Sequence, residues 1–246
     1  MAHLVALDAK EHQQVYIDTQ RAELESAHLN MVPVVVSEFL KLAVQYPIAL
    51  TKNKDTGRFT CIALFGFNTG ENLYLKDDQW DSLYIPLQIQ RQPFFLGDDK
   101  GEYIICIDSE HKSINSQKNN APKNHINQHA KAIFTEEGKA TDFLEHIKSV
   151  LAELLNNESH TQLFIQSILD LKLVQPMQLD ITFANGESTK VEGIYTINEE
   201  NLNALDKDSV FALHQQGFLS LIYTMLTSLG HIYSLVERKN ALLKSL

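Results

Sequence analysis

Hydrophobic positions divide the chain into a strand-rich first half and a helix-rich second half. Short runs at residues 48–52 and 103–107 are typical of buried strands. Between them, polar turns of hairpin length separate further short apolar runs, which also predict strands. The run at 31–36 contains Pro33, which predicts a strand at the edge of a sheet because proline cannot donate a backbone hydrogen bond. These patterns predict an antiparallel-rich sheet.

Residues 178–197 carry the clearest local signal. Apolar and polar residues alternate on both sides of Asn185-Gly186. This pattern predicts a β-hairpin, and the Asn-Gly pair predicts a type I′ turn with positive φ at both central residues.

Apolar periodicity in the second half predicts three helices. One stripe covers residues 143–155, and Asn156-Asn157 is expected to end that helix. Ser159 and Gln162 have the spacing of a capping box, which predicts the start of a second helix. Residues 218–243 are apolar on most sides, which predicts one continuous core helix, although its 3.5-residue spacing would also permit a homodimer contact.

We therefore expect an α+β fold in which an antiparallel-rich β-sheet is covered by a mostly helical C-terminal half. Residues 1–30 mix charged and scattered apolar positions, and are expected to form an N-terminal arm. Residues 31–246 are expected to form a single domain, which is long enough to bury a substantial core. Residues 111–132 interrupt it with four lysines and no acid. So polar a segment is expected to be a surface insertion, either tolerated or used to dock an acidic partner.

Charge and composition narrow the class of protein. The net charge of −10 argues against nonspecific nucleic-acid binding. Cys61 and Cys106 lie in apolar runs and are expected to be buried free thiols, as in a reducing compartment, so a cytoplasmic location is expected. Residues 218–236 lack charge, but polar residues interrupt them, which favours a core helix over a membrane span.

No local motif identifies a reaction. His125 and His129 have the spacing of a helical metal-binding pair, but no third ligand is evident, so we expect surface histidines and neither a metal nor a cofactor. Glycine-rich nucleotide fingerprints and nucleophile elbows are absent from the sequence. Catalytic residues stay unknown, because triads and carboxylate pairs assemble from distant positions.

The stretch 80–97 (WDSLYIPLQIQRQPFFLG) is the densest in large side chains. Trp80, Tyr84, Arg91 and Phe94 are its candidate ligand-binding residues. A guanidinium among aromatic rings either pairs with an internal carboxylate or anchors a peptide or anionic ligand, and the sequence leaves both open.

The same stretch resembles the signature of the SapC family, in which a Tyr-Ile-Pro step precedes an arginine-rich segment ending in Pro-Phe. The resemblance extends to PVVVSEFLKLAVQYPIAL, IICIDS, AIFTEEGKATDFL and HQQGFLSLIYTMLTSL. Where the family commonly has consecutive arginines, this chain has Gln90-Arg91-Gln92, which leaves one cation. The resemblance implies a bacterial accessory protein linked to peptide or small-molecule modification or uptake.

The leading expectation is a non-catalytic binding or accessory protein that acts with a partner protein or peptide. An enzyme of unrecognised type and an accessory factor in surface-layer protein secretion are the alternatives. A deep pocket with converging titratable groups would favour the enzyme, and a shallow aromatic groove would favour binding.

Overall fold

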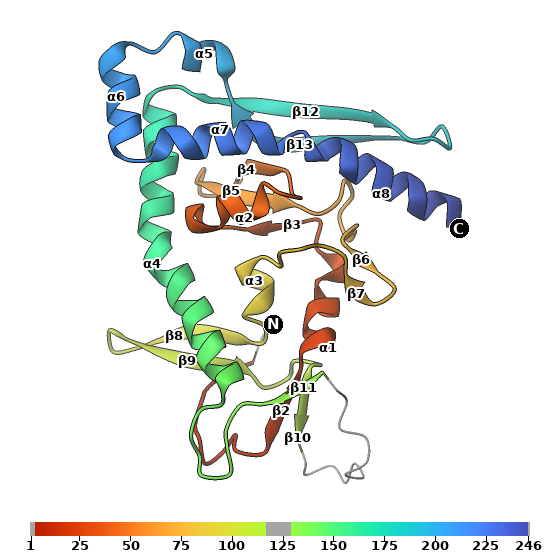
Figure 1. Cartoon of the computed structure of the whole chain (residues 1–246), viewed down its shortest axis with the longest axis vertical. Coiled ribbons are helices and arrows are strands. Elements are labelled where there is room, and N and C mark those ends of the chain that lie inside the picture. The colour runs from red at the N-terminus through yellow and green to blue at the C-terminus, as the bar shows by residue number, and fades with distance from the viewer. Residues whose placement is uncertain (1–2, 117–128, 246) are drawn as a thin grey trace. The chain divides into compact units, whose positions relative to one another are not determined.

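The structure is a computed structural model that describes residues 3–116 and 129–245 (Figure 1). The chain forms two compact units where the sequence predicted one domain. The first unit contains residues 1–27, 77–80 and 87–154, and the second contains residues 28–76, 81–86 and 155–246. The α+β class is confirmed, because both units combine antiparallel strands with helices.

The first unit holds two small antiparallel sheets, with strand orders β1-β9-β8 and β10-β2-β11. The described elements that contribute to it are β1 (Leu4–Ala6), β2 (Val15–Asp18), α1 (Thr19–Leu24), η1 (Glu25–His28), β7 (Gln79–Trp80), α3 (Leu87–Gln90), β8 (Phe94–Asp99), β9 (Glu102–Asp108), β10 (Ile114–Ser116), β11 (Ala130–Ala132) and the first half of α4 (Asp142–Asp170).

The N-terminal residues belong to this fold and do not form the expected arm. β1 pairs with β9, with Leu4 opposite Asp108 and Ala6 opposite Cys106. β2 lies between β10 and β11. Ile17 of β2 is fully buried in the unit's core. Periodicity missed these strands because they are only three and four residues long.

The two ends of the expected insertion are also structured. β10 and β11 both pair with β2, so residues 114–116 and 130–132 belong to a sheet. Residues 117–128 between them, which include His125, lie outside the described residues.

The second unit is built on a five-stranded antiparallel sheet with strand order β12-β13-β4-β5-β3. The predicted edge position of the Pro33 strand and the predicted strand at 48–52 are confirmed. The described elements that contribute to this unit are β3 (Met31–Pro33), η2 (Val36–Glu38), α2 (Phe39–Leu42), β4 (Ile48–Lys52), β5 (Phe59–Leu64), β6 (Leu75–Lys76), the second half of α4, β12 (Val174–Thr182), β13 (Ser188–Ile197), α5 (Glu199–Asn203), α6 (Lys207–Gln215), α7 (Phe218–Ser228) and α8 (His231–Ser245).

The predicted hairpin is confirmed as β12–β13, but its turn is not type I′. Only Gly186 has positive φ (+87°), and Asn185 does not. The Phe183 amide donates to Glu187 O (2.8 Å), and the Gly186 amide donates to Phe183 O (2.9 Å). These bonds close a three-residue loop with glycine at the left-handed position, the next most common hairpin geometry.

The predicted break at Asn156-Asn157 is wrong, because α4 runs through it without interruption. Asparagine costs a helix only about 0.5 kcal/mol, whereas packing of an apolar face supplies most helical stability. α4 contributes such a face to each unit: Leu144, Ile147 and Leu151 in the first, and Phe164, Ile165 and Ile168 in the second.

The predicted continuous C-terminal helix is also wrong, because Leu229 and Gly230 separate α7 from α8. Phe218, Ile222 and Met225 are buried as predicted, and α7 packs beside α2, β4 and β13 (Figure 1). The Ile48 amide donates to the buried Ser228 Oγ (2.9 Å), which joins the end of α7 to β4. Beyond the break the helical phase changes, and Leu235 becomes the buried position.

Candidate functional site

Residues 81–86 of the second unit are held in place by hydrogen bonds to the turn that follows α2. The Ser82 and Tyr46 hydroxyls both donate to the Tyr84 carbonyl, at 2.8 and 2.6 Å. The Leu83 amide donates to Gln45 Oε1. A segment without regular secondary structure therefore has a fixed backbone.

Tyr84 extends this network into the core. Its hydroxyl donates to Glu38 Oε1 (3.0 Å), and Glu38 Oε2 accepts from the Val35 amide (3.2 Å). The Glu38 carboxylate is fully buried, and such a group needs these donors to offset its lost hydration. Lys41 Nζ lies 5.4 Å from the Tyr84 ring centroid, within cation–π range.

Helix α8 holds the other end of the segment. Arg238 Nη1 pairs with Asp81 Oδ2 (2.7 Å), and its Nη2 donates to the Asp81 carbonyl (3.0 Å). The guanidinium also stacks on Tyr74, with Cζ 4.6 Å from the ring centroid. Burial, with a smaller effect of Tyr46, raises the pKa of Tyr74, so its hydroxyl remains a donor to the Gln45 carbonyl.

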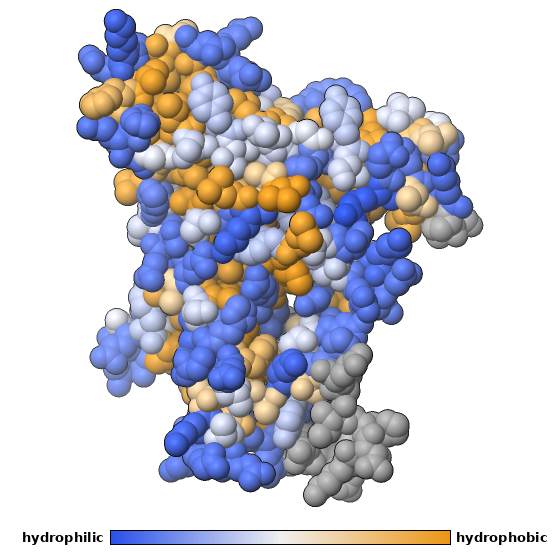
Figure 2. Space-filling view, viewed as in Figure 1, coloured by the Kyte–Doolittle hydropathy of each residue, from blue (hydrophilic) through white to orange (hydrophobic). Residues whose placement is uncertain are grey.

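This framework presents an exposed apolar patch, which we call the α2 patch and define as Leu40, Val44 and Leu83. Their exposed fractions are 74%, 55% and 86%. Leu40 lies on α2 and Val44 lies in the turn that follows it, and Leu83 is bonded through its amide to Gln45, the residue after Val44. Figure 2 shows apolar side chains gathered around the position of α2.

Arg91 lies in the first unit, directly after α3. Its Nε donates to Gln88 Oε1 (2.6 Å), and its Nη1 donates to the Phe94 carbonyl (2.8 Å). The guanidinium stacks on the Phe95 ring, with Cζ 4.2 Å from the centroid. Within the described part of the chain, the contacts of this half-buried cation are thus all neutral: a side-chain amide, a backbone carbonyl and an aromatic ring.

The four predicted site residues do not form one site within either unit. Trp80 is half-buried in β7 and belongs with Arg91 and Phe94 to the first unit, whereas Tyr84 belongs to the second. The Phe94 ring is fully buried in the core of the first unit and contacts the Phe143 ring.

A family model described as SapC matches residues 7–235 of the 246-residue chain. The chain belongs to the SapC family. Comparison with curated proteins finds no match. Comparison with solved structures finds no match either. The match contains both the α2 patch and Arg91, so both belong to the SapC part of the chain.

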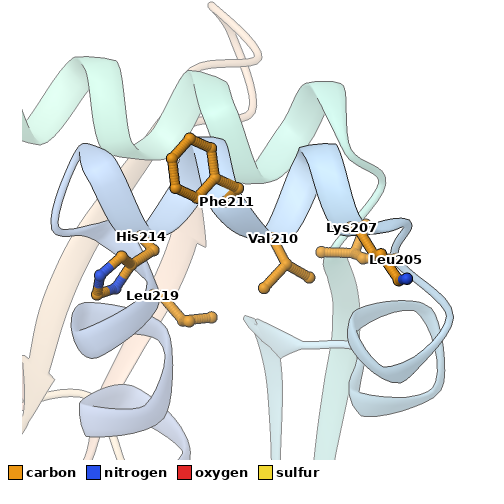
Figure 3. A pocket seen from close by; sticks show the side chains of 6 residues that line it. All are labelled: Leu205, Lys207, Val210, Phe211, His214 and Leu219. Atoms are coloured by element: carbon orange, nitrogen blue, oxygen red, sulfur yellow. The ribbon is translucent and has the colours of Figure 1, made fainter.

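A shallow apolar hollow in the second unit of this SapC-family chain was not predicted. It has a volume of about 440 Å³ and lies between α6 and the start of α7 (Figure 3). Phe211 and His214 of α6 lie three residues apart and so share one helical face. In a helix of nine residues this spacing is too weak a sequence signal to predict the hollow. The lining residues are Leu205, Lys207, Val210, Phe211, His214 and Leu219.

The cysteines are buried and free, as predicted from their apolar runs. Burial, with a smaller effect of Glu158, raises the pKa of the Cys61 thiol, which therefore stays protonated at neutral pH. No group of three or more potential metal ligands occurs among residues 3–116 and 129–245. His125 of the His125 and His129 pair, both expected to be surface histidines, lies outside those ranges.

Proposed function

We propose that this SapC-family chain is a non-catalytic binding or accessory protein that acts with a partner protein or peptide. The observation that carries the proposal is the α2 patch. Its most exposed member, Leu83, is 86% exposed, although hydrogen bonds fix its backbone and its neighbours.

A fixed backbone beneath exposed apolar side chains favours association for a physical reason. Binding costs free energy for each loop that must be ordered, and a segment whose backbone is ordered in advance avoids that part of the cost. The side chains of Leu40, Val44 and Leu83 would lose their contact with water in a complex, which is favourable by about 25 cal/mol per Å² of apolar surface.

The chemistry of the patch favours a partner segment with apolar side chains and a nearby acid. Lys41 lies beside Leu40 in sequence and over the Tyr84 ring, so it supplies a cation at the edge of the patch. As the resemblance to the SapC signature implies, the accessory role proposed here is in peptide or small-molecule modification or uptake. The buried free thiols of Cys61 and Cys106 support placing it in the cytoplasm.

Site-specific photo-crosslinking in the native cell tests the proposal. A benzophenone amino acid at position 83 is expected to capture one protein or peptide, identified by mass spectrometry. The same label at position 163 is the matched control, because Leu163 is also largely exposed (61%) but lies on α4, outside the patch. Leu83→Ser should abolish capture by a label at position 40 while leaving the melting temperature unchanged. Identical products at 83 and 163 would refute the proposal. Products that contain only this chain would show that the patch binds a second copy of the chain and not a different protein or peptide.

A further inference from the structure

Arg91 in the first unit is a half-buried cation without a carboxylate partner in the described part of the chain. Its contacts are the Gln88 side-chain amide, the Phe94 carbonyl and the Phe95 ring. The sequence left two alternatives, an internal carboxylate or an external ligand. The residues that the structure describes provide no internal carboxylate, because each of these contacts is neutral.

The guanidinium keeps donors for a further acceptor. It has five N–H donors, and two of them are used, one on Nε and one on Nη1. The donors left within the described structure are the second N–H of Nη1 and both N–H groups of Nη2. Neighbouring N–H groups on Nη1 and Nη2 form the planar fork that a carboxylate accepts with both oxygens.

The position of the fork is already fixed. Stacking on Phe95 sets the plane of the guanidinium, and the two hydrogen bonds set its rotation in that plane. An ion-pair partner would therefore meet a pre-organised group and would not have to order a mobile arginine.

The positive charge of the half-buried Arg91 side chain favours binding of an anion. Burial lowers the pKa of Arg91 to about 10, so the group is still charged at neutral pH. Taking a cation out of water without a counter-ion is unfavourable, and a bound anion offsets that cost. The contacts that the structure describes for Arg91 include no second cation, so one positive charge is available to a ligand there.

We propose that Arg91, with the Phe95 ring beneath it, is a binding site for a monocarboxylate. The planar fork fits a carboxylate, and one cation neutralises one negative charge. A phosphate dianion would bring a second charge into a poorly hydrated place. This site is in the first unit and does not depend on the α2 patch or on the function proposed for it.

Titration with sodium benzoate, followed by NMR of the labelled arginine side chains, tests this site. We expect saturable shifts of the Arg91 Nε and Nη signals, and none with benzamide, which has the same shape without the charge. Arg91→Lys keeps the charge but loses the fork, and is expected to weaken benzoate binding about tenfold or more. Arg21→Lys, at an exposed arginine of the same unit, should bind benzoate as the parent does.

Two further ligands complete the experiment. A peptide with a free C-terminal phenylalanine that binds tenfold tighter than benzoate would identify a peptide carboxylate as the source, whereas equal or weaker binding would identify a small acid. Arg91 signals that do not respond to benzoate would overturn the proposal, and this holds even if Arg91→Lys fails to fold. Tighter binding of phenyl phosphate than of benzoate would overturn the monocarboxylate class. Loss of crosslinking at position 83 would leave this result untouched.

Discussion

Glu38 and Tyr84 show how a single hydrogen bond supports a surface. The Glu38 carboxylate is fully buried, and its two oxygens accept from the Tyr84 hydroxyl and the Val35 amide. Removing one donor from a buried carboxylate destabilises the fold more than removing an exposed hydrogen bond, because water cannot reach the carboxylate to replace the lost donor. Tyr84 therefore contributes to the stability of the second unit as well as to the position of Leu83.

Tyr84→Phe is expected to lower the free energy of unfolding by about 1–3 kcal/mol, since it removes that donor and leaves the ring in place. Urea unfolding followed by circular dichroism measures the change. Tyr223→Phe is the matched control, because Tyr223 is 52% exposed, and it should change stability by less than about 0.5 kcal/mol. Equal effects of the two substitutions would show that the Glu38 bond does not stabilise the fold.

At the scale of elements, the break between α7 and α8 decides which side chains enter the core. A continuous helix would have continued the stripe of Phe218, Ile222 and Met225 into Leu229 and Ile232. The break leaves these last two only half-buried. The 3.5-residue repeat of the sequence is therefore interrupted in the structure and does not form one long seam.

Met225→Ala is expected to cost about 2–5 kcal/mol, because Met225 is fully buried and its truncation leaves a cavity. Leu229→Ala, expected from the sequence to have a similar effect, should cost clearly less because Leu229 is half-buried. Chemical denaturation of both variants compares them. A loss for Leu229→Ala as large as that for Met225→Ala would mean that this helix packs as the sequence pattern alone predicted.

Gly217 joins α6 to α7 with a left-handed backbone (φ +74°), and an added Cβ would meet no atom within 4 Å. Gly217→Ala should therefore lower the free energy of unfolding by about 1–2 kcal/mol through backbone strain alone. Gly230→Ala is the control, because an added Cβ there would meet Thr227 O at an ordinary 3.5 Å, without positive φ. Differential scanning calorimetry should show a lower melting temperature for the first variant only.

At the scale of the whole molecule, residues 218–244 are long and apolar enough to cross a membrane by length and composition, and 22% of the most apolar window is buried. The same stretch contributes Phe218, Met225 and Leu235 to the second unit's core. Two of its charged residues are also tied to that unit: Arg238 to Asp81, and Lys239 to Glu71 in an ion pair whose side chains are only 14% and 13% exposed.

These contacts would be lost if the stretch crossed a bilayer. The protein is therefore expected in the high-speed supernatant of lysed native cells, as assayed by immunoblotting of supernatant and pellet. A carbonate-resistant pellet would contradict this expectation, because carbonate removes peripheral proteins and leaves spanning helices in the membrane. Glu71→Gln combined with Asp81→Asn serves as a second test, since it removes both carboxylates without adding apolar surface and should leave the protein in the supernatant.

The sequence determined those elements whose residues interact mainly with their neighbours in the chain. Strand β4 appears where a short apolar run predicted it, and Pro33 lies on an edge strand because its missing N–H restricts it in any sheet. The β12–β13 hairpin follows from alternation on both sides of Asn185-Gly186. The family was also recognisable from consecutive residues, and residues 7–235 match it.

Only the tertiary structure decided what depends on distant partners. Asn156-Asn157 stays helical because α4 is held by apolar contacts on either side of it, and the N-terminal strands form because β9, β10 and β11 supply their hydrogen bonds. The same holds for function. Leu83 is ordinary in sequence, and Arg91 could have met a carboxylate. A hydrogen bond from the Leu83 amide to Gln45, 38 residues away, fixes the backbone of Leu83. The absence of a carboxylate among its described contacts distinguishes Arg91.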